Sequence, residues 1–283
     1  MKQILLSLGS AALAAALLCS CGPFQVAEKV VGRSDLEQIA EGLAKQAEDS
    51  ANISEAEKAG LVRWTYTAET DVDKIKIEEH NASVRIETGN VDRVQVSYMD
   101  YADSRGYKLS QGNNTLRITN DSSTAGSSGV TYTTVITLPE KEYREIEIEA
   151  DNSSVVVMDV EADSVCLRNS SNTDVQLSGL AVQQIHTSLI SGMVTVSDST
   201  GYKLAVSLNT GMIQLDNTDM EQYDCQVETG SIEGTILGDP DEYNIRTSVD
   251  VGSNQLPSMA RKQGDRGLRF HAGTGNINVQ FAG

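Results

Sequence analysis

The residues best able to do chemistry are few and scattered along the chain. The three histidines, His80, His186 and His271, have no Cys, His or Asp partner at the spacing of a metal site. No Ser/His/Asp order and no glycine-rich phosphate loop is visible either. We therefore expect each histidine to be an ordinary strand or surface residue, and we predict no catalytic residues, no metal and no other cofactor.

One group of oxygen ligands leaves an alternative open. Asp198, Asp216 and Asn217 fall near the same corner of successive repeats, and Ca²⁺ prefers such hard oxygen ligands. Asp and Asn also form turns through their own side chains. We favour turn formation at these positions, with calcium binding as the alternative.

The most specific chemical signal lies at the N-terminus. A single positive charge at Lys2 precedes an apolar run over residues 4–18. This run is too short and too interrupted by polar residues for a transmembrane helix and is typical of a secretory signal. The run ends in Leu-Cys-Ser-Cys at residues 18–21, which resembles the lipobox of bacterial lipoproteins. The resemblance implies cleavage between Ser20 and Cys21 and lipidation of Cys21, whose acyl chains then anchor the protein. An ordinary secretion signal and an uncleaved anchor are the alternatives.

The overall charge excludes one class of partner. The formal net charge is −18 and the isoelectric point is near 4.5, whereas phosphate binding needs a basic face. We therefore expect no nucleic-acid partner. Aromatic residues make up only 5% of the chain. Val, Ile, Thr, Ser, Asn and Gly are frequent, and this composition favours strands and tight turns.

Residues 21–60 differ from the rest in being rich in Ala and Glu. Apolar residues recur at helical spacing there, at Leu36, Ile39, Leu43 and Ala47. Ser34 is a suitable N-cap with a Glu three residues later, and a second short helix can start at Ser54. We predict a signal peptide over residues 1–20, a tether with one or two short helices over 21–60, and a β domain over 61–283.

From Leu61 onward the apolar residues alternate with polar ones, as in half-buried strands. From about residue 146 to 236 a longer period is added, because Gly192, Gly211 and Gly230 are each 19 residues apart, and the same step backward reaches Thr173 and Ser154. Two strand-like runs flank each of these landmarks. Such a period predicts an all-β fold, a single-stranded parallel β-helix (solenoid) with coils of about 19 residues. The helices before residue 60 and the longer last coils, with Gly252 and Gly275 at their corners, are the candidate caps.

The repeat also decides the state of two cysteines. Cys166 and Cys225 lie three repeats apart, which corresponds to about 14 Å along a stack of parallel strands. A disulfide needs Cα atoms within about 7 Å. We predict two free thiols, mostly buried.

Two groups of residues are candidates for a binding surface. The first is an outward column one position after each landmark, formed by Val155, Met193 and Met212; the alternative is that another segment, such as residues 36–47, covers it. The second is a loop with three tyrosines, Tyr98, Tyr101 and Tyr107, which can anchor a protein or a sugar. Packing at the strand ends explains these tyrosines equally well.

A β-helix can also host a carbohydrate-active enzyme, which needs two carboxylates in a cleft. The uniform 19-residue coils leave no inserted loops to build a cleft. The outward positions three after the landmarks, Gln176, Thr195, Gln214 and Glu233, form an ordinary solvated ladder. We therefore predict that the protein is not an enzyme.

Several stretches resemble a known family. The strands DKIKIEEHNASVRIETGNVDRVQVSY, the repeated SGMVTV, TGMIQL and TGSIEG, and the closing DEYNIRTSVDVGSNQLP and GTGNINVQF are similar to the bacterial "putative adhesin" family of cell-surface β-solenoid domains. That family includes cell-envelope stress proteins of the LiaG type. The resemblance runs from about Trp64 to the C-terminus and implies a right-handed solenoid, but it carries no binding or catalytic residues.

Together these features predict a non-catalytic lipoprotein of the bacterial cell envelope, anchored in a membrane on the extracytoplasmic side. Its β-solenoid surface would bind a surface protein or a glycan, as an adhesin does. The first alternative is an accessory protein of a cell-envelope stress response. A carbohydrate-active β-helix enzyme is the second.

Overall fold

The computed structural model of the chain describes Glu57 and residues 60–80, 82–103, 106–120, 132–151, 154–256 and 266–282, with only the backbone described at 169–172. The chain divides into two compact units, Met1–Glu48 and Asp49–Gly283, and every described residue belongs to the second. The predicted signal peptide, Ser20, Cys21 and the helical stripe at residues 36–47 lie outside the described residues.

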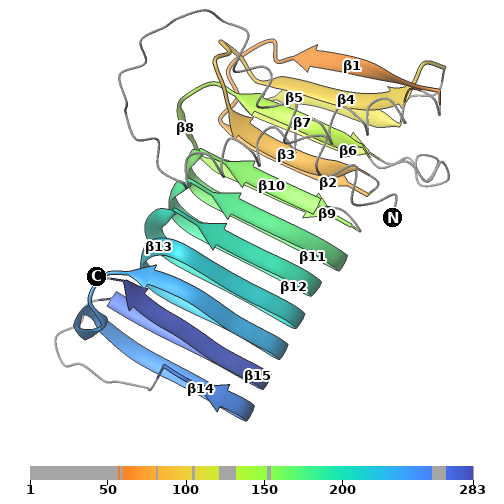
Figure 1. Cartoon of the computed structure of the whole chain (residues 1–283). Coiled ribbons are helices and arrows are strands. Elements are labelled where there is room, and N and C mark those ends of the chain that lie inside the picture. The colour runs from red at the N-terminus through yellow and green to blue at the C-terminus, as the bar shows by residue number, and fades with distance from the viewer. Residues whose placement is uncertain are drawn as a thin grey trace, which may run out of the picture. The chain divides into compact units, whose positions relative to one another are not determined.

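Regular structure in this part of the chain is almost entirely β-strand (Figure 1). The exceptions are the helical residue Glu57 and the short 3-10 helix η2, Pro240–Glu242. All 15 described strands join in one sheet. The all-β prediction is confirmed.

The N-terminal region, residues 61–150, is built from short separate strands. They are β1 (Leu61–Thr67), β2 (Lys74–Glu79), β3 (Ser83–Thr88), β4 (Gln95–Tyr101), β5 (Tyr107–Gly112), β6 (Thr115–Asn120), β7 (Thr133–Leu138), β8 (Glu142–Tyr143) and β9 (Glu145–Ala150). The expected alternation is present: in β2, Ile75, Ile77 and Glu79 are buried while the residues between them are partly exposed. Parallel pairs such as β2–β9 mix with antiparallel pairs such as β1–β4 and β5–β6.

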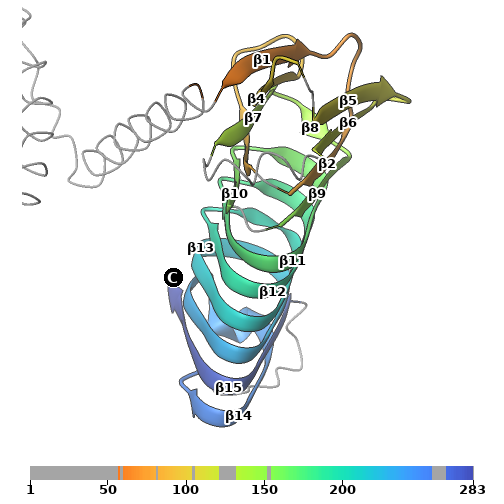
Figure 2. The same cartoon turned by 90° about the vertical axis from the view of Figure 1, so that its right-hand side faces the viewer.

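The rest of the sheet consists of β10 (Ser154–Met158), β11 (Glu161–Ser178), β12 (Ala181–Ser197), β13 (Thr200–Leu237), β14 (Tyr243–Asn254) and β15 (Arg266–Ala282). From β11 onward the strands are long and curl back on themselves as U-shaped rungs (Figure 2). Pairing between β12 and β13 is parallel and joins each residue to the one 19 positions later, from Ala181↔Thr200 to Ser197↔Asp216.

Each rung has two walls, which face each other across the core. The first wall, before the corner, is formed by residues 161–169, 181–189, 200–208, 219–227, 243–249 and 266–272. The second wall begins at the corner and is formed by 173–178, 192–197, 211–216, 230–237, 251–254 and 274–282. In the N-terminal region separate strands continue the walls, because β9 and β10 pair with the two halves of β11.

Glycine makes the corner of the later rungs, where a side chain does not fit, whereas Thr173 pairs with Gly192 and holds this position in β11. Gly192, Gly211 and Gly230 have φ angles of 134°, 143° and 143°, a region that costs residues with a side chain free energy. A Cβ on Gly211 would also lie 1.8 Å from the carbonyl oxygen of Gly192 in the preceding rung. The corner positions inferred at Gly192, Gly211 and Gly230 are therefore confirmed, as are Gly252 and Gly275, which pair with each other. The landmark at Ser154 is wrong by one residue, because Ser154 pairs with Asp174 and not with Thr173.

Stacking order and chain order differ at the C-terminal end. The order in the sheet is β13–β15–β14, so the last strand of the chain inserts between its two predecessors. As a result β14 lies at one end of the pairing order and β1 at the other. Among the residues that the structure describes, no helix is long and apolar enough to span a membrane.

A candidate ligand-binding groove on the first wall

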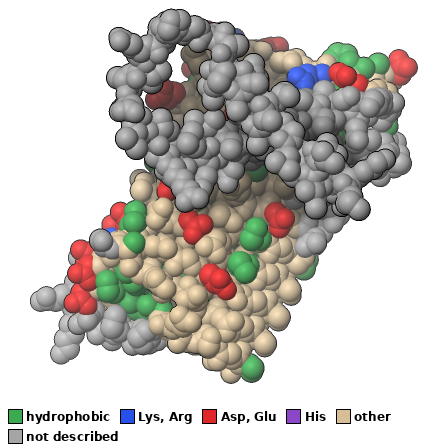
Figure 3. All heavy atoms as spheres, in the orientation of Figure 1, with side chains coloured by type: hydrophobic (Ala, Val, Ile, Leu, Met, Phe, Trp, Pro, Cys, Tyr) green, Lys and Arg blue, Asp and Glu red, His purple; other side chains and the backbone are tan. Residues whose placement is uncertain are grey.

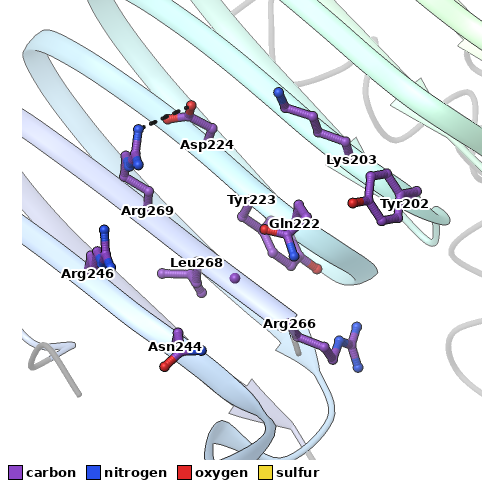
Figure 4. Close-up of a pocket in the computed structure, with 11 residues that line it drawn as sticks. Tyr202, Lys203, Gln222, Tyr223, Asp224, Asn244, Arg246, Arg266, Leu268 and Arg269 are labelled. Carbon is purple, nitrogen blue, oxygen red and sulfur yellow. Dashed lines mark ion pairs between the residues drawn. The ribbon is translucent and has the colours of Figure 1, made fainter. Parts of the chain in front are cut away.

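A groove of about 700 Å³ lies on the outer face of the first wall, across β13, β15 and β14 (Figure 4). Gly267 interrupts a column of outward side chains there, since it pairs with Gln222 on one side and Asn244 on the other. A Cβ on Gly267 would meet Gln222 Oε1 at 2.3 Å. The missing side chain therefore makes room for the hollow and for the Gln222 amide beside it.

The next outward column carries charge along the groove. Asp224 pairs with Arg269, and Arg269 pairs with Arg246 on the outermost strand. Asp224 Oδ2 lies 3.9 Å from Arg269 Nη1, the one ion pair drawn in Figure 4. Because β15 lies between β13 and β14, Arg269 is adjacent to Asp224, whereas Arg246 is separated from Asp224 by a strand.

Arg266 is held firmly at the start of β15. Its guanidinium donates to Asp219 and to the carbonyl oxygen of Met220, and it lies 4.4 Å from the centre of the Tyr243 ring. Glu221 and Glu242 are its other acidic neighbours, at 3.8 Å and 3.5 Å. These contacts make Arg266 a fixed side of the groove, with most of its charge already balanced.

The two walls differ in where their basic residues lie. The described parts of the rungs, residues 154–256 and 266–282, contain five Lys and Arg residues, and all five lie on the first wall: Arg168, Lys203, Arg246, Arg266 and Arg269. Figure 3 views the second wall, which carries β10 and the arrow ends of the rungs in Figure 1. Its described surface is mostly uncharged polar atoms with scattered acidic and hydrophobic side chains.

One protein-family model matches most of this domain. The family model described as Toastrack DUF4097 matches residues 72–282, which include nearly all the strands described above. The chain belongs to this family. The match confirms the resemblance drawn from the repeated stretches. No curated protein matches the chain.

Solved structures similar to this Toastrack chain share little sequence with it. One is described as a putative adhesin from Bacteroides fragilis, with 14% identity, 78% of this chain and 97% of that chain covered, and a TM-score of 0.46. A putative cell adhesion protein from Clostridium sporogenes has 14% identity, 78% and 100% coverage, and a TM-score of 0.35.

The Toastrack domain buries two of the three tyrosines predicted to form a binding surface. Tyr98 and Tyr107 are 6% and 5% exposed, and their rings pack against each other at a tilt of 37° with centroids 4.5 Å apart. Only Tyr101, at the end of β4, is partly exposed. The surface prediction is therefore wrong for Tyr98 and Tyr107, because they fill the core where β4 and β5 meet, as the strand-packing alternative held.

Tyr107 is also part of a polar cluster in the core of the N-terminal region. Its hydroxyl donates to Glu79 Oε2 at 2.5 Å and lies 2.6 Å from Thr134 Oγ1. The buried Glu79 also accepts from Asn120 Nδ2 at 2.6 Å and from the Ala82 amide at 3.0 Å. Burial, and next the charge of Glu79, raise the pKa of Tyr107 well above its usual value. The cluster is enclosed, so its role is structural.

The predicted methionine column needs one correction. Met193 and Met212 pair with each other and face outward, and Met193 is 42% exposed. Val155 does not belong with them, because it pairs with Val175 and is fully buried. The step from β10 to β11 is 20 residues rather than 19, so Val155 and Val157 point inward.

The same change of phase separates the two cysteines. Both are free, but Cys225 is buried while Cys166 is partly exposed. Cys166 pairs with His186 in an outward column, whereas Cys225 pairs with the buried Phe270. The prediction of a buried thiol is thus correct for Cys225 and wrong for Cys166. Burial raises the pKa of both thiols.

The remaining chemical candidates are dispersed. The described residues hold no group of three or more His, Cys, Asp or Glu side chains able to bind a metal ion. His80 Nδ1 lies 2.9 Å from Asp151, and His271 Nδ1 lies 2.9 Å from Ser248. Asp198 and Asn217 have φ angles of 47° and 54°, and Asn217 Nδ2 donates to Asp198 at 3.4 Å, as expected for turn residues.

Sequence reasoning missed the groove of the Toastrack domain. Three of its basic residues, Arg246, Arg266 and Arg269, lie in the last coils, which were interpreted only as caps. One weak signal was available: the two basic residues of the regular repeats, Arg168 and Lys203, both precede the corner of their repeat. That bias indicates on which wall basic residues lie, but it does not predict the hollow at Gly267.

Proposed function

We propose that this Toastrack protein is a non-catalytic cell-envelope lipoprotein that binds a partner through the outer surface of its rungs, as an adhesin does. The observation that carries the proposal is the groove, which places arginine, lysine, amide and tyrosine side chains on an open face of an acidic protein. We further propose that the regular rungs form a single-stranded parallel β-helix with coils of about 19 residues. Such a stack provides a rigid surface because each rung is fixed by its neighbours.

A binding role suits the groove better than catalysis. Glycoside hydrolysis requires two carboxyl groups across the scissile bond. Among the residues that line the groove only Asp224 carries a carboxylate, and it faces Arg269. These side chains can orient a ligand by charge and hydrogen bonds but do not supply an acid and base pair.

We propose that Cys21 carries the lipid anchor on the extracytoplasmic side, with a tether over residues 21–60 between anchor and domain. Labelling growing cells with a radioactive fatty acid tests the anchor. We expect labelled wild-type protein and a labelled Cys19→Ser variant, and no label on Cys21→Ser, because only the thiol after the cleavage site receives the lipid. Label that persists on Cys21→Ser would contradict the assignment.

The binding function is tested with the full chain on arrays of glycans, peptidoglycan fragments and matrix proteins. We expect saturable binding to at least one class, lost after heat denaturation because the surface depends on the folded rungs. A folded sample that binds nothing on any array would contradict the proposed function.

A further inference from the structure

We propose that the groove binds an acidic saccharide, with the sugar carboxylates on Arg246 and Arg269 and a sugar ring against Tyr202. This inference rests on the proposed binding function and names the chemical class of the ligand. It follows from the charge of the groove, from which of those charges are available, and from the side chains between them.

The groove reverses the charge of the rest of the molecule. It is lined by Lys203, Arg246, Arg266 and Arg269, against a single acidic residue, Asp224, in a chain with a net charge of −18. An anionic ligand is therefore attracted to this place and repelled elsewhere. Charge complementarity of this kind selects where a ligand docks.

The basic side chains are not all committed to the protein. Neither Lys203 nor Arg246 forms an ion pair with another described residue, and both are exposed. Among the residues that the structure describes, Arg269 forms one ion pair, with Asp224 at 3.9 Å, and its side chain is 59% exposed. A carboxylate can therefore approach Arg246 and Arg269 together. Guanidinium groups bind carboxylates through paired charge-assisted hydrogen bonds.

The neutral part of the lining fits a sugar. Tyr202 is 56% exposed and stands beside Lys203 at one side of the groove, as Figure 4 shows. An aromatic ring with a polar end packs on the apolar face of a sugar. The amide side chain of Gln222 lies between this ring and the arginines, and that of Asn244 lies on β14, the strand that carries Arg246. Both amides can exchange hydrogen bonds with hydroxyl groups.

The surroundings favour separated charges over a dense polyanion. Asp219, Glu221 and Glu242 surround Arg266 at one side of the groove, so the open basic area is short. A nucleic acid needs many phosphate contacts along a continuous basic face. A polysaccharide with one carboxylate per sugar ring matches the available groups better.

The test is titration calorimetry of the full chain with oligosaccharides of galacturonic and of glucuronic acid, each compared with its methyl ester. The ester keeps the sugar rings and removes the charge. We expect saturable binding of at least one acid, about tenfold weaker binding of its ester, and weaker binding at high salt, because charge-assisted contacts are lost or screened. Absence of saturable binding by both acids, or equal binding of acid and ester, would overturn the proposal.

Variants locate the site. We expect Arg246→Gln and Arg269→Gln each to weaken binding about tenfold, and Tyr202→Ala to weaken binding of acid and ester alike. Arg168→Gln is the matched control, since Arg168 is also an exposed first-wall arginine with one acidic neighbour, Glu147 at 3.4 Å; its binding should equal that of the wild type. Thermal unfolding confirms that each variant is folded.

The array and the titration fail in different ways. An array partner whose binding is unchanged in Arg246→Gln and Arg269→Gln would overturn this inference and leave the binding function standing. Binding to no array at all, together with no binding of the acids, would overturn both.

Discussion

The N-terminal region and the rungs build the same two walls by different means. In the rungs one continuous strand turns the corner at glycine, and neighbouring rungs repeat the same contacts. In the N-terminal region separate strands form each wall, some antiparallel, and the core contains the polar cluster around Glu79. The comparison teaches that repetition fixes the rungs through backbone geometry, whereas the N-terminal region depends on particular side chains.

The sharpest test of this difference is a corner glycine. In Gly211→Ala the new Cβ would clash with the backbone of the preceding rung at a φ of 143°, so the free energy of unfolding should fall by about 3 kcal/mol or more. Urea unfolding measures the change. Gly112→Ala is the control, because that glycine of β5 has no heavy atom within 4 Å of a new Cβ. Equal effects of the two substitutions would remove the claimed role of the corner.

The N-terminal region should instead be sensitive at Glu79. Glu79→Ala removes the acceptor for Tyr107, Asn120 and the Ala82 amide, and buried polar groups left without partners cost about 3 kcal/mol together. Its neighbour Glu78 faces outward and pairs with the exposed Arg117 at 3.2 Å, so Glu78→Ala should cost less than about 1 kcal/mol. Both values come from urea unfolding. A mild effect of Glu79→Ala would refute the polar cluster as a source of stability.

Alkaline pH provides a smaller and graded effect. Burial raises the pKa of Tyr107 well above its usual value of 10.0, so above pH 10 the unfolded chain releases this proton while the folded protein keeps it. Stability from this group is therefore complete below pH 10 and declines as pH rises toward the folded pKa, by about 1.4 kcal/mol per pH unit.

Urea unfolding at several pH values compares the wild type with Tyr107→Phe. We expect a shallower loss of stability above pH 10 in the variant. Other buried tyrosines, among them Tyr223 with its pKa raised to about 12, contribute to the slope that remains. Identical slopes would show that Tyr107 ionises equally well in the folded state.

The smallest effect concerns reactivity and leaves stability unchanged. In the folded protein a thiol reagent should modify Cys166, which is partly exposed, and should reach the buried Cys225 only after unfolding. Mass spectrometry after short labelling measures each site, and Cys166→Ser and Cys225→Ser assign them. Fast labelling of Cys225 in the folded state would contradict the inward orientation of its strand.

Sequence predicted the rungs well because their determinants repeat at a fixed spacing. Gly192, Gly211 and Gly230 revealed the corners, and the alternation around them revealed the core. The errors at Val155 and Cys166 share one cause, a 20-residue step at the first rungs, which the 19-residue spacing of the glycines does not contain.

The rest depended on contacts between distant residues. Tyr98 and Tyr107 pack together, and Glu79 joins β2 to β5 and β6 through hydrogen bonds. No regular spacing of residues along the chain predicts these contacts. The groove required the inserted position of β15, which places Arg269 beside Asp224 and leaves Arg246 at the end. The sequence shows which residues of the groove are charged, but it does not show which side chains lie beside them in the fold.

Hydrogen exchange of the full chain, with and without a saturating acidic oligosaccharide, tests most directly whether the rungs bind and the N-terminal region only supports them. The account predicts slower amide exchange in β13, β14 and β15 on binding, with β1 to β9 unchanged. Slower exchange in the N-terminal region alone, or no change in the rungs, would contradict it.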